Sequence, residues 1–331
     1  MKVLGGDIGG TNTRLALFEL EGKRFRTLVE RTYSSRNYET LHEIVESFVE
    51  SEQIKCDGAC FGIAGPVRGD RVETTNLPWV VEAPELAVHL GTDRVGLIND
   101  LEANAYGIAT LDAKDFQTLS RGDTKAVGNL GLIAAGTGLG EAALFWDGKE
   151  HRPFACEGGH TDFAPEGELE TALRDHLSKR FGHVSWERVL SGPGLANIHS
   201  FLVQSRRTEI HPCRVEEMPE DDRAAAISQA AFSGSCPLCG DSLDLFVKFY
   251  GAEASNLALK VMATGGLYIG GGIAPKIAEK LKAPGFMEAF HGKGRMRPLL
   301  EAVPVRVILN DRTALLGAAR CASLRTALKG S

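Results

Sequence analysis

The chain has 331 residues, of which 43% are hydrophobic and 24% are charged, and its formal net charge is −6. This composition is typical of a globular enzyme with about two domains, and the acidic balance argues against nucleic acid or an anionic membrane as a partner. No apolar run reaches the ~18 residues that a membrane helix needs, and a strand is expected from Lys2, so we expect no signal peptide and a cytoplasmic location.

The first predicted element is a strand over residues 2–4, followed by Gly-Gly-Asp-Ile-Gly-Gly-Thr-Asn and a second strand over residues 14–19. We predict a hairpin in which Gly9 and Gly10 adopt backbone angles denied to other residues. Backbone N–H groups at such a turn can approach polyphosphate oxygens, and a carboxylate can hold hydrated Mg²⁺. An isolated glycine cluster is more often an ordinary hairpin. The residues predicted to bind phosphate or, for Asp7, a magnesium ion through water are Asp7, Gly9, Gly10, Thr11 and Asn12.

A third strand is predicted over residues 24–33, then a helix from about Glu39 to Glu52 with one apolar face. Strands over 58–63 and 71–75, a short helix over 84–90, a strand over 95–98 and a helix over 101–110 complete an α/β domain that we expect to end near residue 111.

The strand over 95–98 delivers Asn99 and Asp100 to its C-terminal end, the edge at which open α/β sheets place ligands. Asp100 is therefore a candidate general base. Asp and Asn are also preferred N-caps, and the following helix makes that reading about equally probable from local sequence. The two roles do not exclude each other.

The second part of the chain opens with another strand, glycine turn and strand, Leu132-Ile-Ala-Ala-Gly-Thr-Gly-Leu-Gly140, with Thr137 and Gly138 as candidate phosphate ligands. This recurrence indicates that the chain carries the unit twice. The Glu157-Gly-Gly-His160 segment that follows can point two different polar groups into one pocket, although loop histidines are usually only solvated or structural. Glu187 comes next, and its plain interpretation is an exposed glutamate at a helix start.

Helices are predicted near 168–181, 192–205, 222–231 and 244–263, with an exposed loop over 208–222. Seven cysteines, an odd number spread along the chain, indicate a reducing compartment. We interpret Cys236-Pro-Leu-Cys239 as a structural turn, because no second C-x-x-C and no suitably spaced Cys/His pair accompanies it, and no βαβ unit adjoins it.

A third glycine run, Gly270-Gly-Gly-Ile273, follows a predicted strand over 267–269, and Gly271 and Gly272 are candidate nucleotide contacts. Pro275 suits the first turn of a helix whose N-terminus would offer N–H groups to a nucleotide. A strand over 305–309 and a helix over 313–328 end the chain. Neither the Walker pattern nor a clean G-x-G-x-x-G occurs at the three turns, which argues against a P-loop or Rossmann enzyme.

The order of these segments resembles the bacterial-type glucokinase family over nearly the whole chain, within the hexokinase and actin-like ATPase superfamily and outside its ROK group. The matching blocks are Gly6 to Asn12, Gly62 to Pro66, Thr75-Asn-Leu-Pro-Trp79, Asn99-Asp100, Gly136 to Gly140, Glu157 to His160, Ser185 to Leu195 and Gly270 to Ile273. The cysteine cluster that binds zinc in ROK proteins is missing, because Cys156 has no neighbouring cysteines.

The resemblance implies an α/β fold of two ribonuclease-H-like domains with an interdomain cleft. Residues 1–111 would form the small domain, joined by the C-terminal helix 312–331, and residues 112–311 the large one. It also implies a cytoplasmic homodimer active in glycolysis, which uses ATP and Mg²⁺ to phosphorylate the C6 hydroxyl of glucose. In this family the general base would be Asp100, and the sugar hydroxyls would be held by Asn99, Asp100, Glu157, His160 and Glu187.

Three alternatives remain open at this level: a kinase of another hexose, a sugar-sensing regulator that binds without turnover, and an assembling ATPase. The retained Asp100 and the expectation of no helix-turn-helix before Lys2 speak against the regulator. An assembling ATPase would not need the polar residues that suit a sugar.

Overall fold

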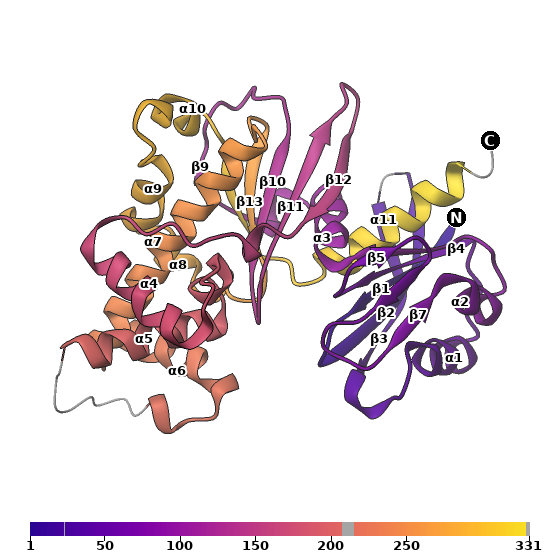
Figure 1. Ribbon diagram of the computed structural model, residues 1–331. Coiled ribbons are helices and arrows are strands. Elements are labelled where there is room, and N and C mark those ends of the chain that lie inside the picture. Colours follow the sequence, from indigo (N-terminus) through magenta and orange to yellow (C-terminus); the bar gives the residue numbers. More distant parts are fainter. Residues whose placement is uncertain (23, 207–214, 329–331) are drawn as a thin grey trace. The chain divides into compact units, whose positions relative to one another are not determined.

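The computed structural model describes residues 1–331 except 23, 207–214 and 329–331 (Figure 1). Contacts along the chain group it into two compact units. Unit 1 comprises Met1–Asp115, Arg152–Ala155 and Asn310–Ser331, and unit 2 comprises Phe116–His151 and Cys156–Leu309. The domain boundaries expected from the sequence, at 111/112 and 311/312, stay a prediction.

The sheet of unit 1 has the strand order β3-β2-β1-β4-β8. β1 pairs antiparallel with β2 and parallel with β4, and β4 pairs parallel with β8. The registers place Ile8 beside Ile63 and Ile63 beside Asn99, so the carboxyl ends of the three parallel strands lie along one edge. The strands are β1 (Lys2–Ile8), β2 (Asn12–Glu21), β3 (Arg24–Ser34), β4 (Gly58–Ile63) and β8 (Val95–Asn99).

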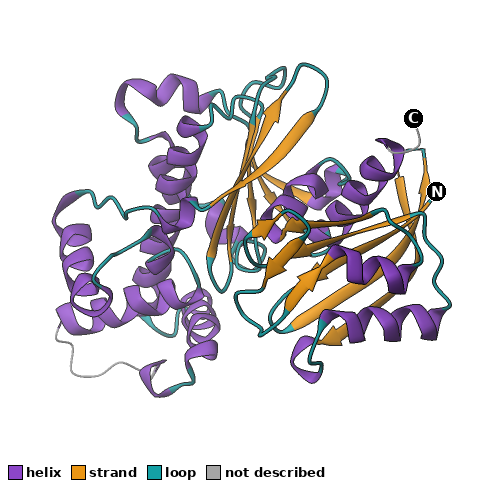
Figure 2. Ribbon diagram, turned by 45° about the vertical axis from the view of Figure 1, so that its right-hand side comes forward, coloured by secondary structure: helices purple, strands orange, loops and turns teal. Residues whose placement is uncertain are grey.

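Helices cover both faces of this sheet, because alternate residues of each strand point to opposite sides. Leu4 and Phe61 share a core with α1 (Leu41–Glu52) and α2 (Ala83–Leu90). Val3 and Cys60 share another with α3 (Asp100–Ile108) and α11 (Thr313–Leu328) (Figure 2). The remaining short elements are η1 (Ser35–Asn37), η2 (Ala113–Asp115) and the antiparallel set β5 (Val67–Arg68), β6 (Arg71–Glu73) and β7 (Val80–Glu82).

Glycines let α11 approach β1 and α3 closely. A Cβ at Gly5 would lie 2.7 Å from the carbonyl oxygen of Leu315, and a Cβ at Gly317 would overlap the carbonyl oxygen of Ala103. Both positions require glycine, because backbone atoms of the neighbouring element occupy the place that a Cβ would take. The final helix begins at Thr313, as the sequence indicates, and its apolar residues are buried in unit 1.

The six-stranded sheet has the order β12-β11-β10-β13-β14-β9, and it belongs to unit 2 except for residues 152–155 of β12, which group with unit 1. It repeats the pattern of the first sheet, since β10 pairs antiparallel with β11 and parallel with β13, which pairs parallel with β14. The internal repeat inferred from the glycine turns therefore corresponds to two sheets of like topology. The strands are β9 (Phe116–Ser120), β10 (Leu130–Ala135), β11 (Leu139–Trp146), β12 (His151–Cys156), β13 (Gly266–Gly270) and β14 (Val305–Ile308).

The core of unit 2 is built around one long helix, α7 (Pro237–Lys260), which packs against β10 and β13. Its Tyr250 hydroxyl accepts a hydrogen bond from the Ala135 N–H at 3.1 Å and lies 3.2 Å from the Gly270 carbonyl oxygen. The other helices are α4 (Gly167–Phe181), α5 (Gly192–Arg206), α6 (Glu220–Ser233), α8 (Ala278–Leu281), α9 (Pro284–His291) and α10 (Arg297–Glu301).

The structure corrects three predicted boundaries. β1 continues to Ile8 and includes Asp7, because its first glycines pair within the sheet. α7 begins at Pro237, since Cys236 serves as its N-cap residue and proline suits the first turn. The helix expected at Pro275 begins only at Ala278, after a series of turns, and has four residues.

The loop predicted over 208–222 is tested in part. Its residues 208–214 lie outside the described chain, while Val215–Glu217 form the 3-10 turn η5 and α6 begins at Glu220. Among the described residues, no helix combines the length and apolarity needed to span a membrane.

Replacing Gly317 by alanine should destabilise the protein, because the new Cβ would force α11 away from α3. Overpacking of this kind costs about 1–3 kcal/mol, which urea unfolding and the thermal midpoint would measure. Gly285→Ala in α9 is the matched control, since its Cβ would have no atom within 4 Å. Equal stability of both variants would contradict the close packing of α11.

Candidate functional site

The first glycine turn is held in a fixed shape by its own backbone and by Ser35. The Gly9 N–H donates to the Asn12 carbonyl oxygen at 3.0 Å, and the Ser35 N–H donates to the Thr11 carbonyl oxygen at 2.9 Å. The Ser35 hydroxyl donates to the Gly9 carbonyl oxygen at 2.8 Å. The turn at the end of β1 is therefore braced from the start of η1.

The sequence predicted that Gly9 and Gly10 adopt backbone angles denied to other residues. This prediction was wrong, because neither residue has a positive φ in the structure. A Cβ at Gly10 would instead lie 2.7 Å from the Cβ of Asn76, and one at Gly9 would lie 3.1 Å from the Asn12 carbonyl oxygen. Glycine is needed here because neighbouring groups fill the space, and Asn76 belongs to the Thr75-Asn-Leu-Pro-Trp block of the sequence.

Asp7 lies near the end of β1, directly opposite Arg14 of β2. The pKa of Asp7 is raised to about 6, mainly by burial; the Arg14 guanidinium opposes the rise, and the charges of Asp100 and Asp311 add to it. Asp7 and Asp100 therefore lie close enough to interact, as expected from parallel strands that end at one edge. A positive ion beside them would relieve the repulsion between two carboxylates.

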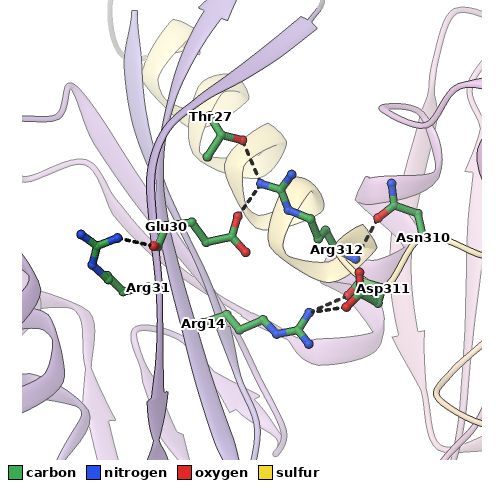
Figure 3. A network of polar contacts seen from close by, with 7 residues as sticks. All are labelled: Arg14, Thr27, Glu30, Arg31, Asn310, Asp311 and Arg312. Atoms are coloured by element: carbon green, nitrogen blue, oxygen red, sulfur yellow. Dashed lines mark hydrogen bonds and ion pairs between the residues drawn. The ribbon is translucent and has the colours of Figure 1, made fainter.

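Polar contacts fasten the residues at the start of α11 to β2, which carries Arg14, and to β3 (Figure 3). Arg14 donates to the side chain and the carbonyl oxygen of Asp311, both at 3.1 Å. Arg312 contacts Glu30 at 2.5 Å and donates to the Thr27 hydroxyl at 2.8 Å. This network fixes the guanidinium that faces Asp7.

The end of β8 presents Asn99 and Asp100 at the start of α3. Asn99 is the N-cap: its Oδ1 accepts from the Leu101 N–H at 2.9 Å, and its Nδ2 donates to the Gly65 carbonyl oxygen at 3.2 Å. Asp100 is the first residue of the helix, and its Oδ1 also accepts from the Leu101 N–H, at 3.0 Å. Asn99 therefore takes most of the capping role that was considered for Asp100. The carboxylate of Asp100 is half-buried at the edge of the sheet.

In unit 2 the second glycine turn lies against Glu187. The Gly136 N–H donates to the Gly138 carbonyl oxygen at 2.8 Å, and the Gly192 N–H to the Gly136 carbonyl oxygen at 2.8 Å. Glu187 lies in the 3-10 turn η4 (Trp186–Arg188) and its Oε2 accepts from the Leu139 N–H at 3.0 Å. Glu187 lies at a helix start, as the plain interpretation had it, but it is half-buried rather than exposed.

Glu157 and His160 bracket another short turn, η3 (Gly158–His160), which packs on the same part of β11. A Cβ at Gly159 would overlap the Leu139 carbonyl oxygen, which explains the glycine. The Glu157 Oε2 and His160 Nε2 atoms are 3.9 Å apart, and both side chains are largely exposed. The N–H and the carbonyl oxygen of Leu139 thus bring the segments of Glu157, His160 and Glu187 together.

The third glycine run adjoins the second turn at the carboxyl ends of β10 and β13. Gly271 has a φ of +80° and its Cβ would collide with the backbone of Ala135. The Ile273 N–H donates to the Ala135 carbonyl oxygen at 3.2 Å. The structure therefore places Gly271 and Gly272 beside the turn that carries Thr137, although the expected helix N-terminus is not there.

Sequence reasoning missed Glu141, a buried carboxyl group on β11 beneath η3. A Cβ at Gly158 would overlap its Oε2, and the Glu141 side chain shares a hydrogen bond with Glu253 of α7. Burial, followed by the charge of Glu253, raises the pKa of Glu141 to about 8, while Lys260 lowers it. Burial also raises the pKa of Glu253. The available signal was one acidic residue within an otherwise apolar strand.

A family model described as glucokinase matches residues 4–325. The chain is 40% identical over 338 residues to a glucokinase from Trichormus variabilis, covering 97% of this chain and 98% of the relative. This chain belongs to the glucokinase family.

Solved structures agree with this family assignment. A glucokinase from an Antarctic psychrotroph is similar with a TM-score of 0.85 and 31% identity, covering 98% of this chain and 99% of its own. A ROK-family glucokinase from Streptomyces griseus, solved with glucose and AMPPNP, has a TM-score of 0.66 at 22% identity and covers 98% and 100% of the two chains, which shows a shared fold. The predicted glucokinase family and its α/β actin-like ATPase fold are confirmed.

The buried Glu141 should make the stability of this glucokinase-family chain depend on pH. Its folded pKa of about 8 exceeds the ordinary 4.5, so the folded chain holds a proton that the unfolded chain releases. The free energy of unfolding should therefore fall as pH rises from about 4.5 to about 8. Glu141→Gln should flatten this fall.

Urea unfolding at a series of pH values measures the effect, with the exposed Glu168→Gln as control. If the free energy of unfolding falls with pH equally in the wild type and in both variants, Glu141 does not hold the proton.

Proposed function

We propose that this protein is an ATP-dependent glucokinase, which transfers the γ-phosphoryl group to the C6 hydroxyl of glucose with Asp100 as general base. The observation that carries the proposal is that two carboxylates interact at one edge of the unit 1 sheet, Asp7 near the end of β1 and Asp100 directly after β8. A phosphoryl transfer to an alcohol needs a proton acceptor and a neutralising charge close together.

The ATP phosphates are assigned to the glycine turns. The Gly9 N–H already closes its own turn, so the amides of Gly10 and Thr11 are better placed to donate than that of Gly9. Backbone N–H groups at a turn of this kind can donate to phosphate oxygens. The full set assigned to ATP is Gly9, Gly10, Thr11 and Asn12 in unit 1, and Thr137, Gly138, Gly271 and Gly272 in unit 2.

The residues around Asp7 suit Mg²⁺, which prefers carboxylate oxygens and keeps several of its waters. Asp7 fits this role through water, because its half-buried carboxyl group lies at the strand end within reach of the charge of a second carboxylate. When bound, the ion supplies neutralisation of the negative charge on the phosphates. Arg14, held by Asp311, lies opposite Asp7 in the sheet and lowers its pKa.

The sugar hydroxyls are assigned to polar side chains that can accept or donate several hydrogen bonds. A carboxylate accepts from adjacent hydroxyls and discriminates against sugars that lack one. In unit 2, the Leu139 N–H holds Glu187 in place for such a contact. In unit 1, Asn99 positions Asp100 by capping α3 and retains one further N–H to donate. The assigned residues are Asn99, Asp100, Glu157, His160 and Glu187.

Asp100 would act as base when the C6 oxygen attacks the γ-phosphorus. The alcohol has a pKa far above 7, so the carboxylate takes its proton as the O–P bond forms and the bond to the β-phosphate oxygen breaks. ADP leaves with the electron pair of that bond. The homodimer, the cytoplasmic location and a role in glycolysis, all implied by the family resemblance, stay predictions.

Asp100→Asn should lower kcat by about 10²- to 10⁴-fold, the usual contribution of a positioned base, while ATP and glucose still bind. A coupled assay of glucose 6-phosphate formation and calorimetric titration of each ligand measure the two quantities. Asp70→Asn, an exposed change in the same unit, is the control and should keep wild-type turnover. Wild-type kcat in Asp100→Asn would overturn the base assignment, and glucose binding without turnover in the wild type would overturn the kinase proposal.

Glu187→Gln should raise KM for glucose by roughly 10- to 100-fold, because a hydrogen bond to a charged group contributes about 1.5–3 kcal/mol. The amide oxygen can still accept from the Leu139 N–H, so the thermal midpoint should change little. Steady-state kinetics at saturating ATP provide KM and kcat separately. A lower thermal midpoint with an unchanged KM would show that Glu187 is purely structural.

A further inference from the structure

The Cys-Pro-Leu-Cys motif, interpreted from sequence as a turn, lies beside a histidine from another helix. The ligand atoms of His199, Cys236 and Cys239 all lie within 4.8 Å of one another. His199 comes from α5, while Cys236 is the N-cap of α7 and Cys239 lies in its first turn. The sequence shows no suitably spaced Cys/His pair beside this motif, and the histidine that the fold brings to it lies 37 positions before Cys236.

We propose that His199, Cys236 and Cys239 bind a zinc ion that fastens α5 to the start of α7. Two sulfur atoms and one imidazole nitrogen form a soft donor set, which favours zinc over magnesium or calcium. The described residues supply three of the four ligands that a structural zinc ion takes. This site is distinct from the Asp7 site, whose oxygen donors suit a hard cation.

The local structure favours metal binding by each of the three side chains. Cys236 and Cys239 lie at the N-terminal end of α7, where backbone N–H groups and the helix dipole stabilise thiolates. His199 Nδ1 lies 3.2 Å from the Glu216 Oε1 atom of η5. A carboxylate on Nδ1 orients the ring and directs Nε2 to a metal, the usual second contact of a zinc-bound histidine.

Burial argues against a redox role for the two cysteines. The exposed fractions of Cys236, Cys239 and His199 are 1%, 0% and 1%. Cysteines that exchange disulfides need access to a partner thiol, whereas structural zinc sites are closed to solvent. Zinc binding would release about two protons as both thiols become thiolates, with no change of oxidation state.

The proposed zinc ion would stabilise the helices that support the second glycine turn. α5 begins at Gly192, whose N–H binds the Gly136 carbonyl oxygen of that turn. α7 carries Tyr250, which binds the Ala135 N–H just before the turn. Joining the two helices at His199 and Cys236 therefore restrains both supports at once.

Metal analysis of the full-length protein tests the proposal directly. The protein is purified without a histidine tag, chelator or added metal, and zinc, iron, cobalt, nickel and copper are measured by mass spectrometry. We expect about one zinc per chain in the wild type. The double variant with Cys236→Ser and Cys239→Ser should lose it, whereas Cys60→Ser, a buried cysteine of β4, should keep it.

Exchange of the metal for Co²⁺ keeps the test decisive if the double variant does not fold. The wild type should give the absorption of tetrahedral cobalt with thiolate charge transfer, His199→Gln should weaken it, and removal of the metal should lower the thermal midpoint. Three results would each overturn the proposal: a wild type with neither stoichiometric zinc nor this spectrum, equal zinc in the double variant and the wild type, or a Cys236–Cys239 disulfide in the unreduced protein.

Discussion

The desolvated carboxyl group of Asp7, at the carboxyl edge of the sheet and within reach of the charge of Asp100, is the constraint on which the proposed chemistry of unit 1 depends. The parallel register of β1, β4 and β8 ends the three strands at one edge, with β4 between the strand that carries Asp7 and the strand that Asp100 follows. Burial is the largest cause of the raised pKa of Asp7, and the charge of Asp100 adds to the rise. A carboxyl group held in this way favours a cation beside it, and unit 1 partly offsets its charge with the guanidinium of Arg14.

Unit 2 organises its proposed ligands through backbone contacts. Leu139 is the centre: its N–H holds Glu187, and its carbonyl oxygen packs on Gly159 between Glu157 and His160. Behind this surface, α7 contributes Tyr250 to the end of β10 and Glu253 to the buried pair with Glu141. Because these supports all come from one long helix, the packing of α7 determines the shape of the second turn, and the zinc site proposed at its start acts on the same helix.

The sequence predicted most of this fold, since the signals were local. Periodicity located the final helix from Thr313, and the two glycine turns indicated a repeat that the strand orders of the two sheets bear out. The family blocks also pointed to Asp100. These inferences rest on short segments whose residue order alone carries the information.

The remaining features depend on contacts between distant segments. Gly10 is glycine because of Asn76, which is 66 residues away, and no turn rule could reveal that neighbour. Glu141 gains its proton from burial against Glu253, and the C-x-x-C motif gains His199 only when α5 and α7 pack together. The helix predicted at Pro275 does not form there. Its local sequence signal was favourable, but the chain follows turns in which Ile273 binds Ala135.

The most direct test of the central claim is the titration of Asp7 by carboxyl NMR in the ligand-free protein, in the wild type and in Asp100→Asn. The account predicts that the Asp7 pKa lies near 6 and falls in the variant, because one of the charges that raises it is removed. An Asp7 pKa at the ordinary value of 3.8, unchanged by the substitution, would contradict it.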